Sequence, residues 1–270
     1  MQQKLRLMAV FPHPDDESLG MGGTLAKYAA EGVETYLICA TRGERGWAGA
    51  EEDNPGLEAL GRIREAELRC AAIQLRLHEL CFLDYLDGDV DQADPLEIIA
   101  KLSMLIRRIQ PHVLVTFSLD GIYGHPDHIA LAQFTGAAIM RAADASFQDA
   151  DRQPAFAVSK FYQLVDSVQT VNAVRETIGG LSMLVDGVLR EHVGWENWAI
   201  TTRIDTRPYF DQAWKAILCH QSQLPGFGNL VDLPRERLLE IWAEGCFVRI
   251  FSLVNGGRAV EYDLFEGLRE

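Results

Sequence analysis

The sequence predicts an α/β fold in which helices cover both faces of a mostly parallel, Rossmann-like sheet. Short apolar runs alternate with Ala/Leu-rich segments along the first half of the chain. Polar loops separate them, and a histidine-rich or acidic motif follows two of the apolar runs. Such alternation is typical of βαβ units, in which helices connect parallel strands. We therefore expect the active site outside the carboxyl ends of the strands, where open α/β sheets bind their ligands.

The elements follow from the pattern in chain order. We expect strands over residues 5–11, 34–40, 79–83, 113–117, 159–165 and 247–253, and helices over residues 18–31, 57–77, 95–109, 129–143 and 208–220. Arg107 and Arg108 close the third helix, and Pro111 follows it, as is usual at a helix end. Residues 167–199 are aromatic and polar, and we interpret them as an insertion or cap on a single domain spanning residues 1–270.

Composition excludes several classes of partner. The 270 residues are 48% hydrophobic and 24% charged, which is typical of a globular protein. No apolar run approaches the ~18 residues that span a bilayer, and Arg6 interrupts the first apolar stretch, so we expect no secretory signal. The net charge of −14 repels phosphate backbones, which argues against nucleic acid and anionic membranes as partners.

The five cysteines do not form a recognisable pattern. Their number is odd and no C-x-x-C pair occurs, so neither a disulfide framework nor an all-thiolate zinc site fits. We expect small buried hydrophobes in a reducing cytoplasm. The positions are Cys39, Cys70, Cys81, Cys219 and Cys246.

Two similar motifs follow the first and fourth predicted strands. Residues 13–16 read HPDD and residues 125–128 read HPDH. Proline is favoured at the first position of a helix, so we expect each histidine to cap a helix and the next two side chains to lie in its first turn. If the strand order is 3-2-1-4, the first and fourth strands are neighbours at the point where the order reverses. The two motifs would then face each other.

The residues of these motifs suit a catalytic metal. Histidine and aspartate are good zinc ligands, and three protein ligands with one open position are typical of catalytic zinc. We predict that His13, Asp16 and His128 bind Zn²⁺, which lowers the pKa of a bound water towards ~7. Fe²⁺ or Co²⁺ would fit the same ligands.

The remaining motif residues suit proton transfer. We expect Asp15 to be the general base, and His125 to be a cation that stabilises an oxyanion or a general acid for a leaving amine. Asp127, two residues on, would orient His125 and raise its pKa.

The paired motifs resemble those of the LmbE-like deacetylases. That family includes the N-acetylglucosaminyl-phosphatidylinositol de-N-acetylases (PIG-L) and the bacterial deacetylases of mycothiol and bacillithiol synthesis. The likeness extends to TRGERG (41–46), RIREAELRCAA (62–72), FLDYLDG (82–88) and CHQSQ (219–223). Pro12 stands where many members have alanine, and residues 169–199 match nothing in the family pattern, which leaves substrate choice open.

The resemblance implies the same metal ligands and base, and it adds further candidates. Tyr123 is similar to a tyrosine that helps to bind the oxyanion, although a packed loop aromatic is an equal alternative. Arg64 is similar to an arginine near the sugar, but a surface ion pair with Glu65 or Glu67 would also explain it. Asp87 is a weaker substrate-binding candidate, because aspartate is common in D-G turns.

Four other histidines have no predicted catalytic role. His220 is either a residue that supports the site or an ordinary residue near a helix end. We expect His78, His112 and His192 to be surface or packing residues.

The sequence thus predicts a zinc-dependent hydrolase that removes acetyl from an N-acetylglucosaminyl conjugate. Selection of the sugar would come from the loops at residues 42–47, 84–89 and 169–199, whose tryptophans either cover a pyranose or pack the cap. A broader amidase acting on sugar–amino-acid conjugates is the alternative within enzymes. A nucleotide-binding Rossmann domain is disfavoured, because Leu25 replaces the third glycine after GMGG (20–23). A metal-binding protein without activity would not need Asp15 and His125. Assembly into a homo-oligomer is left open.

Overall fold

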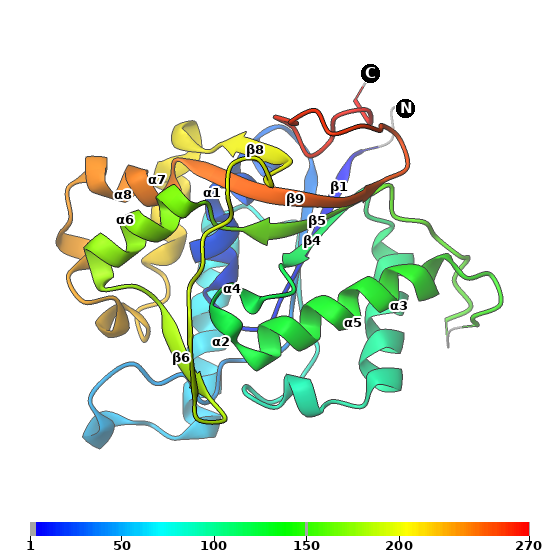
Figure 1. The fold of residues 1–270 in the computed structure, drawn as a ribbon. Coiled ribbons are helices and arrows are strands. Elements are labelled where there is room, and N and C mark those ends of the chain that lie inside the picture. The colour runs from blue at the N-terminus through cyan, green and yellow to red at the C-terminus, as the bar shows by residue number, and fades with distance from the viewer. Residues whose placement is uncertain (1–3, 149–150, 270) are drawn as a thin grey trace.

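A computed structural model describes residues 4–148 and 151–269. Within them a seven-stranded sheet has the order β3-β2-β1-β4-β5-β9-β8 (Figure 1). The parallel strands are β1 (Arg6–Phe11), β2 (Glu34–Cys39), β3 (Glu79–Phe82), β4 (Val113–Phe117) and β5 (Lys160–Val165). The predicted α/β fold and the 3-2-1-4 order are confirmed. β1 and β4 are neighbours, so the order reverses between them.

Helices cover both faces of this sheet, because its central strands are apolar on both sides. Leu7 and Phe11 of β1 belong to the core shared with α1 (Asp16–Ala30), α2 (Leu57–Gln74) and α7 (Phe210–Ile217). Met8 and Val10 face the opposite core, formed with α3 (Pro95–Ile109) and α5 (Pro126–Ala143). Figure 1 shows α3 and α5 side by side on their face. No helix in residues 4–148 and 151–269 is long and apolar enough to cross a bilayer.

The second half departs most from the sequence prediction. β9 (Glu244–Ser252) pairs antiparallel with β5, and β8 (Thr202–Asp205) pairs antiparallel with β9. Residues 167–199 contain α6 (Val168–Ile178) and a hairpin of β6 (Ser182–Val185) and β7 (Val188–Glu191). Both hairpin strands are short and largely exposed, so no clear hydrophobic periodicity predicted them. Also present are α4 (Gly121–Gly124), α8 (Arg235–Trp242) and 3-10 turns at Glu51–Asp53, Val90–Gln92, Arg207–Tyr209, Leu224–Phe227 and Leu230–Asp232.

The cysteine prediction is only partly correct. Cys39 and Cys246 are buried free thiols, as expected. Cys70 and Cys219, however, form a disulfide between residues 149 positions apart, which joins α2 to the segment after α7. Sequence spacing could not reveal this pair, because only the packing of α2 against α7 brings the two side chains together.

A buried ion pair joins the antiparallel edge of the sheet to the C-terminal segment. The ammonium of Lys160 on β5 is fully buried and donates to Glu261 Oε1 at 2.7 Å. Glu261 also accepts from Tyr162, Thr202 and Asn255 at 2.7, 3.0 and 2.6 Å. Burial opposes ionisation, but the bonds from Lys160, Asn255 and Tyr162 outweigh it and lower the pKa of Glu261 to about 2.

Glu261→Gln should lower the free energy of unfolding near neutral pH by about 3–5 kcal/mol, because it leaves the buried ammonium of Lys160 without a counter-charge. Because folding lowers the pKa of Glu261, the stabilisation is complete above pH 4.5, the ordinary pKa of glutamate. It is progressively lost as the pH falls towards about 2. The difference between wild type and variant should therefore shrink over that range, as measured by urea denaturation. Glu266→Gln, at an exposed position of the same segment, is the matched control. A difference that stays constant down to the lowest pH would contradict this account.

Candidate active site

The two motifs meet at the carboxyl ends of β1 and β4, as the topology predicted. His125 caps α5: the backbone N–H of Asp127 donates to its Nδ1 at 3.2 Å, and Pro126 occupies the first turn. The first motif differs from the prediction. Asp15, and not His13, precedes α1, and its φ of 108° lies in the left-handed region that is unfavourable for a non-glycine residue. Such strain is typical of functional sites, where the surrounding structure holds it.

The three predicted metal ligands converge. Asp16 presents Oδ2 at 3.5 Å from His13 Nδ1 and Oδ1 at 3.7 Å from His128 Nε2. The backbone N–H of His13 donates to the same carboxylate at 2.8 Å, which fixes its orientation. Asp16 thus lies between the two imidazoles, one carboxylate oxygen facing each of them.

Asp127 does not act as the sequence predicted. We expected its carboxylate to orient His125, but Oδ2 lies 3.1 Å from His13 Nε2 and accepts from Gly88 N–H at 2.7 Å. Oδ1 accepts from Val90 N–H at 3.1 Å, and the side chain is fully buried. Residues two apart on a helical turn point in different directions, which explains why His125 and this carboxylate do not pair. In the structure the Asp127 carboxylate therefore contacts His13 and not the ring of His125.

Asp87 also contacts His13. Its Oδ1 lies 3.0 Å from His13 Nε2, and its Oδ2 accepts from the backbone N–H of Arg45 at 3.0 Å. The residue is 7% exposed and its carboxylate already contacts His13 and Arg45, so a role in substrate binding stays a prediction. Burial would lower the pKa of His13, but Asp127, Asp16 and Asp87 outweigh burial and raise it well above the usual value.

Arg64 is not a surface residue and pairs with neither Glu65 nor Glu67. Its guanidinium is buried, donates to the carbonyl of Gly43 at 3.0 Å and also reaches the carbonyl of Pro14. It lies 3.2 Å from Asp15 Oδ2, so it holds the expected base. Burial raises the pKa of Asp15 to about 6, and the charge of Arg64 opposes that shift. A carboxylate with a pKa near 6 is well suited to accept a proton near neutral pH.

The surroundings of His125 favour a neutral ring that donates a hydrogen bond over the cation that we expected. Burial and the charge of His13 lower the pKa of His125, and together they outweigh the charge of Asp127, which raises it in the predicted direction. Because Nδ1 accepts from Asp127 N–H, the proton of the neutral ring is on Nε2. His125 stacks on His128 with ring centroids 4.7 Å apart, and Tyr123 packs edge-on to both. Burial raises the pKa of Tyr123, so its hydroxyl keeps its proton and can donate.

His220 supports the start of α1, which is the first of the two roles considered from the sequence. Its Nε2 lies 2.9 Å from Glu17 Oε1. Glu17 is fully buried, contacts Ser18 and accepts from the backbone N–H of Asp15 at 3.0 Å. The pair thereby links the end of α7 to the strained backbone of Asp15. The sequence signal for Glu17 was its place in HPDDE, but its partner is more than 200 positions away.

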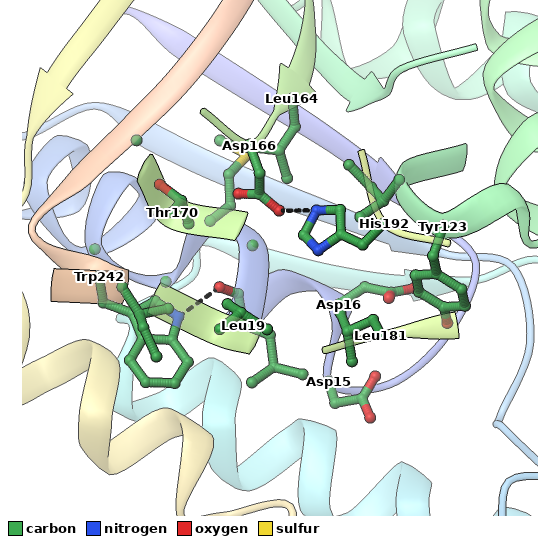
Figure 2. Close-up of a pocket in the computed structure, with 18 of the residues that line it drawn as sticks. Asp15, Asp16, Leu19, Tyr123, Leu164, Asp166, Thr170, Leu181, His192 and Trp242 are labelled. Carbon is green, nitrogen blue, oxygen red and sulfur yellow. Dashed lines mark hydrogen bonds and ion pairs between the residues drawn. The ribbon is translucent and has the colours of Figure 1, made fainter. Parts of the chain in front are cut away.

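A cavity of about 330 Å³ opens beside these residues (Figure 2). Asp15, Asp16, Tyr123 and His128 form part of its wall. The rest is mainly apolar and comes from α1, β5, α6 and α8. Gly20, Gly22 and Gly23 line it from inside α1, and so are not a phosphate-binding turn between a strand and a helix. The nucleotide-binding alternative therefore has no support in the structure.

The tryptophans that we expected near the substrate lie elsewhere. Trp198 is 86% exposed, Trp195 donates to Asp120 at 3.3 Å, and Trp47 donates to the carbonyl of Ala50 at 2.8 Å. Trp242 of α8 lines the cavity instead, with Nε1 fixed by the carbonyl of Leu19 at 2.7 Å. His192 also lines the cavity, so describing it as a surface or packing residue was incomplete.

The donor set fits a divalent metal ion. His128 is 2% exposed, yet neither of its ring nitrogens has a hydrogen-bond partner among the described residues. Burial lowers the pKa of His128 to about 3, which keeps the ring neutral and able to ligate. Among the described residues, two clusters have ligand atoms within 4.8 Å of one another, His13–His125–His128 and His13–Asp87–Asp127, and the predicted set of His13, Asp16 and His128 is not one of them. In the second cluster both carboxylates already accept backbone N–H bonds and face His13 Nε2, which is typical of groups that orient a metal ligand.

Comparison with known proteins shows the family to which the chain belongs. Residues 8–139 match the family described as PIG-L, GlcNAc-PI de-N-acetylase. The chain is 32% identical to the 1D-myo-inositol 2-acetamido-2-deoxy-alpha-D-glucopyranoside deacetylase of Rhodococcus jostii, over 97% of this chain and 98% of that protein. It is 29% identical to the mycothiol S-conjugate amidase of Streptomyces coelicolor, over 100% and 99%. The crystal structure of the conserved protein TT1542 from Thermus thermophilus matches with a TM-score of 0.67 and 25% identity, over 93% and 97%.

The relatives cover the whole length of the described fold, and the match to the family includes both histidine motifs. The structure of this chain independently shows the sheet order, the convergence of His13, Asp16 and His128, and the contact of Arg64 with Asp15. This chain belongs to the PIG-L family of LmbE-like de-N-acetylases.

Proposed function

We propose that the protein is a metal-dependent hydrolase that removes the acetyl group from an N-acetylated amino sugar, an N-acetylglucosaminyl conjugate. The observation that carries this proposal is the convergence of His13, Asp16 and His128, because Asp16 and His128 line a cavity together with Asp15. Similarity to the Rhodococcus jostii deacetylase supports the choice of substrate class.

His13, Asp16 and His128 would hold the metal, with Zn²⁺ as the first candidate and Fe²⁺ as the alternative. A bound divalent ion would polarise the amide carbonyl and make water a better nucleophile. The contacts of Asp127 and Asp87 to His13 Nε2 leave Nδ1 as the nitrogen that faces Asp16. Carboxylates that fix a ligating histidine in this way usually strengthen metal binding.

The chain's own residues account for the proton transfers. Asp15 takes a proton from the attacking water while Arg64 holds its carboxylate in place. Nε2–H of His125 and the hydroxyl of Tyr123 donate to the carbonyl oxygen as it gains negative charge. When the C–N bond breaks, the proton carried by Asp15 passes to the leaving nitrogen. The products are acetate and the free amine.

A second candidate activity and the cellular location are also proposed. An amidase acting on sugar–amino-acid conjugates would use the same residues, and the similarity to the Streptomyces coelicolor amidase is what favours it as the second candidate. A cytoplasmic location remains our prediction, and the Cys70–Cys219 disulfide is the observation that argues against it, because disulfides are rare in reducing compartments.

Metal analysis tests the ligand set. Purified protein should contain one divalent ion per chain, and His128→Ala and Asp16→Ala should each lose most of it. Asp127→Asn should keep a weakened site, with affinity reduced roughly 10–100-fold, because it removes a support of His13 and not a ligand. His78→Ala, at an exposed histidine, is the matched control. Full metal content in both His128→Ala and Asp16→Ala would contradict the assignment.

Asp15→Asn separates catalysis from metal binding. The amide keeps the shape of the side chain but cannot accept the proton from water. Turnover should fall by roughly two to four orders of magnitude while metal content stays normal. Steady-state acetate release and elemental analysis of the same preparation give both quantities. A near-normal rate would show that another group takes the proton.

Substrate preference tests the sugar deacetylase against the amidase. Sites built to hydrogen-bond hydroxyls reject analogues that lack them by up to ~10⁴-fold. We expect acetate release from N-acetylglucosaminyl conjugates and little from acetyl-lysine peptides at the same metal loading. Comparable rates on both would favour the general amidase. Hydrolysis of sugar–amino-acid conjugates without release of acetate from N-acetylglucosaminyl compounds would favour the conjugate amidase.

A further inference from the structure

The cavity beside Asp15 is much larger than an acetyl group requires. Its volume is about 330 Å³, whereas an apolar cavity of about 150 Å³ already holds benzene. The methyl of an acetyl group would fill only a small part of this space. The site therefore has room for a second group of the substrate, next to the bond that breaks.

The wall away from the metal ligands is mainly apolar. Leu164 comes from β5, Val174 and Ile178 from α6, and Leu181 from the start of the hairpin segment. Trp242 closes the other side, and Figure 2 shows it across the cavity from Tyr123. Burying an apolar group here would contribute affinity in proportion to the area removed from water. A polyhydroxylated group would leave many hydroxyls without partners on this wall.

Several polar side chains also line the cavity, among them Thr170, Gln223 and Glu244, and one polar pair faces it from the segment after β5. His192 is 4% exposed, and its Nε2 lies 3.0 Å from Asp166 Oδ2. Neither ring nitrogen has a hydrogen-bond partner of good geometry among the described residues, so Nε2 is only close to Asp166 and Nδ1 is unpaired. Figure 2 shows the ring beside Asp166, with the second nitrogen turned away from the carboxylate and towards the cavity. With the ring proton on Nε2, facing Asp166, Nδ1 is an acceptor and requires a hydroxyl or N–H of a ligand.

The segment that carries His192 is attached to the catalytic loop. Arg190 of β7 donates to the carbonyl of Gly124 at 2.8 Å, one residue before His125. Trp195 donates to Asp120 at 3.3 Å, at the start of the same loop. A group seated between α6 and the hairpin segment is thus held in a fixed relation to the proposed catalytic residues.

We propose that the substrate carries, beside its scissile amide, an apolar group of about six or more carbons that occupies this cavity, and that His192 Nδ1 accepts a hydrogen bond from a hydroxyl or N–H next to that group. The inference rests on the proposed function and adds the class of group that the same site selects. The group is either the aglycone of the sugar or a longer acyl chain in place of acetyl, in which case the same reaction extends to N-acyl amino sugars. Residues 166–192 supply one side of the site, and they include most of the segment that matches nothing in the family pattern.

Two series of compounds distinguish the sources of the apolar group. The first series varies the acyl group on glucosamine from acetyl to octanoyl. The second keeps N-acetyl and varies the aglycone from methyl to octyl. In one series, kcat/KM should rise with chain length by up to ~4-fold per methylene, and the other series should be nearly flat. The rising series identifies the source.

Variants locate the effect in this cavity. Val174→Phe places a larger side chain in the cavity and should reduce the octyl-to-methyl or octanoyl-to-acetyl ratio of kcat/KM at least tenfold. Asn172→Phe, at an exposed position of the same helix, is the matched control and should leave that ratio unchanged. His192→Phe keeps a ring but removes the acceptor, and should lower kcat/KM for the preferred long-chain compound about 3–10-fold. His192→Gln, which restores an acceptor, should recover part of that loss.

Calorimetric titration of Asp15→Asn protein with non-hydrolysed octyl β-glucoside separates this inference from the proposed function. We expect the glucoside to bind Asp15→Asn protein, and to bind at least tenfold more weakly when Val174→Phe is added. This result would support the apolar site even if no compound of either series were hydrolysed. Deacetylation with flat length dependence in both series, and no effect of Val174→Phe on the titration, would overturn the inference while leaving the proposed function intact.

Discussion

The contact between the Asp127 carboxylate and His13 Nε2 is the interaction on which the rest of the site depends. One fully buried carboxylate joins three segments: it faces His13 after β1, it accepts from Gly88 and Val90 after β3, and it belongs to the first turn of the helix after β4. Such a buried charge is tolerable only because each oxygen has partners. Through it, the ends of three strands are held in one arrangement, and the imidazole of His13 has a single orientation towards Asp16.

The opposite side of the site is built by a second, independent set of contacts. Arg64 reaches Asp15 from α2, and His220 reaches Glu17 from the end of α7. Both therefore act on the two residues that flank Asp16 in sequence, where the chain turns into α1 with an unfavourable backbone conformation at Asp15. The disulfide between α2 and the residue before His220 connects these supports. The base is thus held by groups that are separate from those that hold His13, which is why metal binding and proton transfer can be tested with different variants.

What the sequence predicted well was local or followed from strand order. His13 and Asp16 belong to one short motif at a strand end, and the alternation of strands and helices placed that end at the reversal of the sheet. The predictions that failed concern contacts between residues that are distant in sequence, or a contact assigned to the wrong one of two sequence neighbours. Asp127 was assigned to His125 because the two are close in sequence, but the helical turn directs its carboxylate to His13. The sequence around His192 gave no sign of a role, because its partner and the cavity form only when residues 167–199 pack against α4 and α8.

The most direct test of this account is the protonation and metal contact of each nitrogen of His13, read by nuclear magnetic resonance of ¹⁵N-histidine-labelled protein during titration with Zn²⁺. The account predicts that Nδ1 of His13 and a nitrogen of His128 change shift on metal binding, while Nε2 of His13 keeps its proton. Substituting Asp127 by asparagine should weaken the protection of that Nε2 proton from exchange with solvent. A metal-induced change at Nε2 of His13, with Nδ1 unaffected, would contradict the assignment of Asp127 as the residue that positions this ligand.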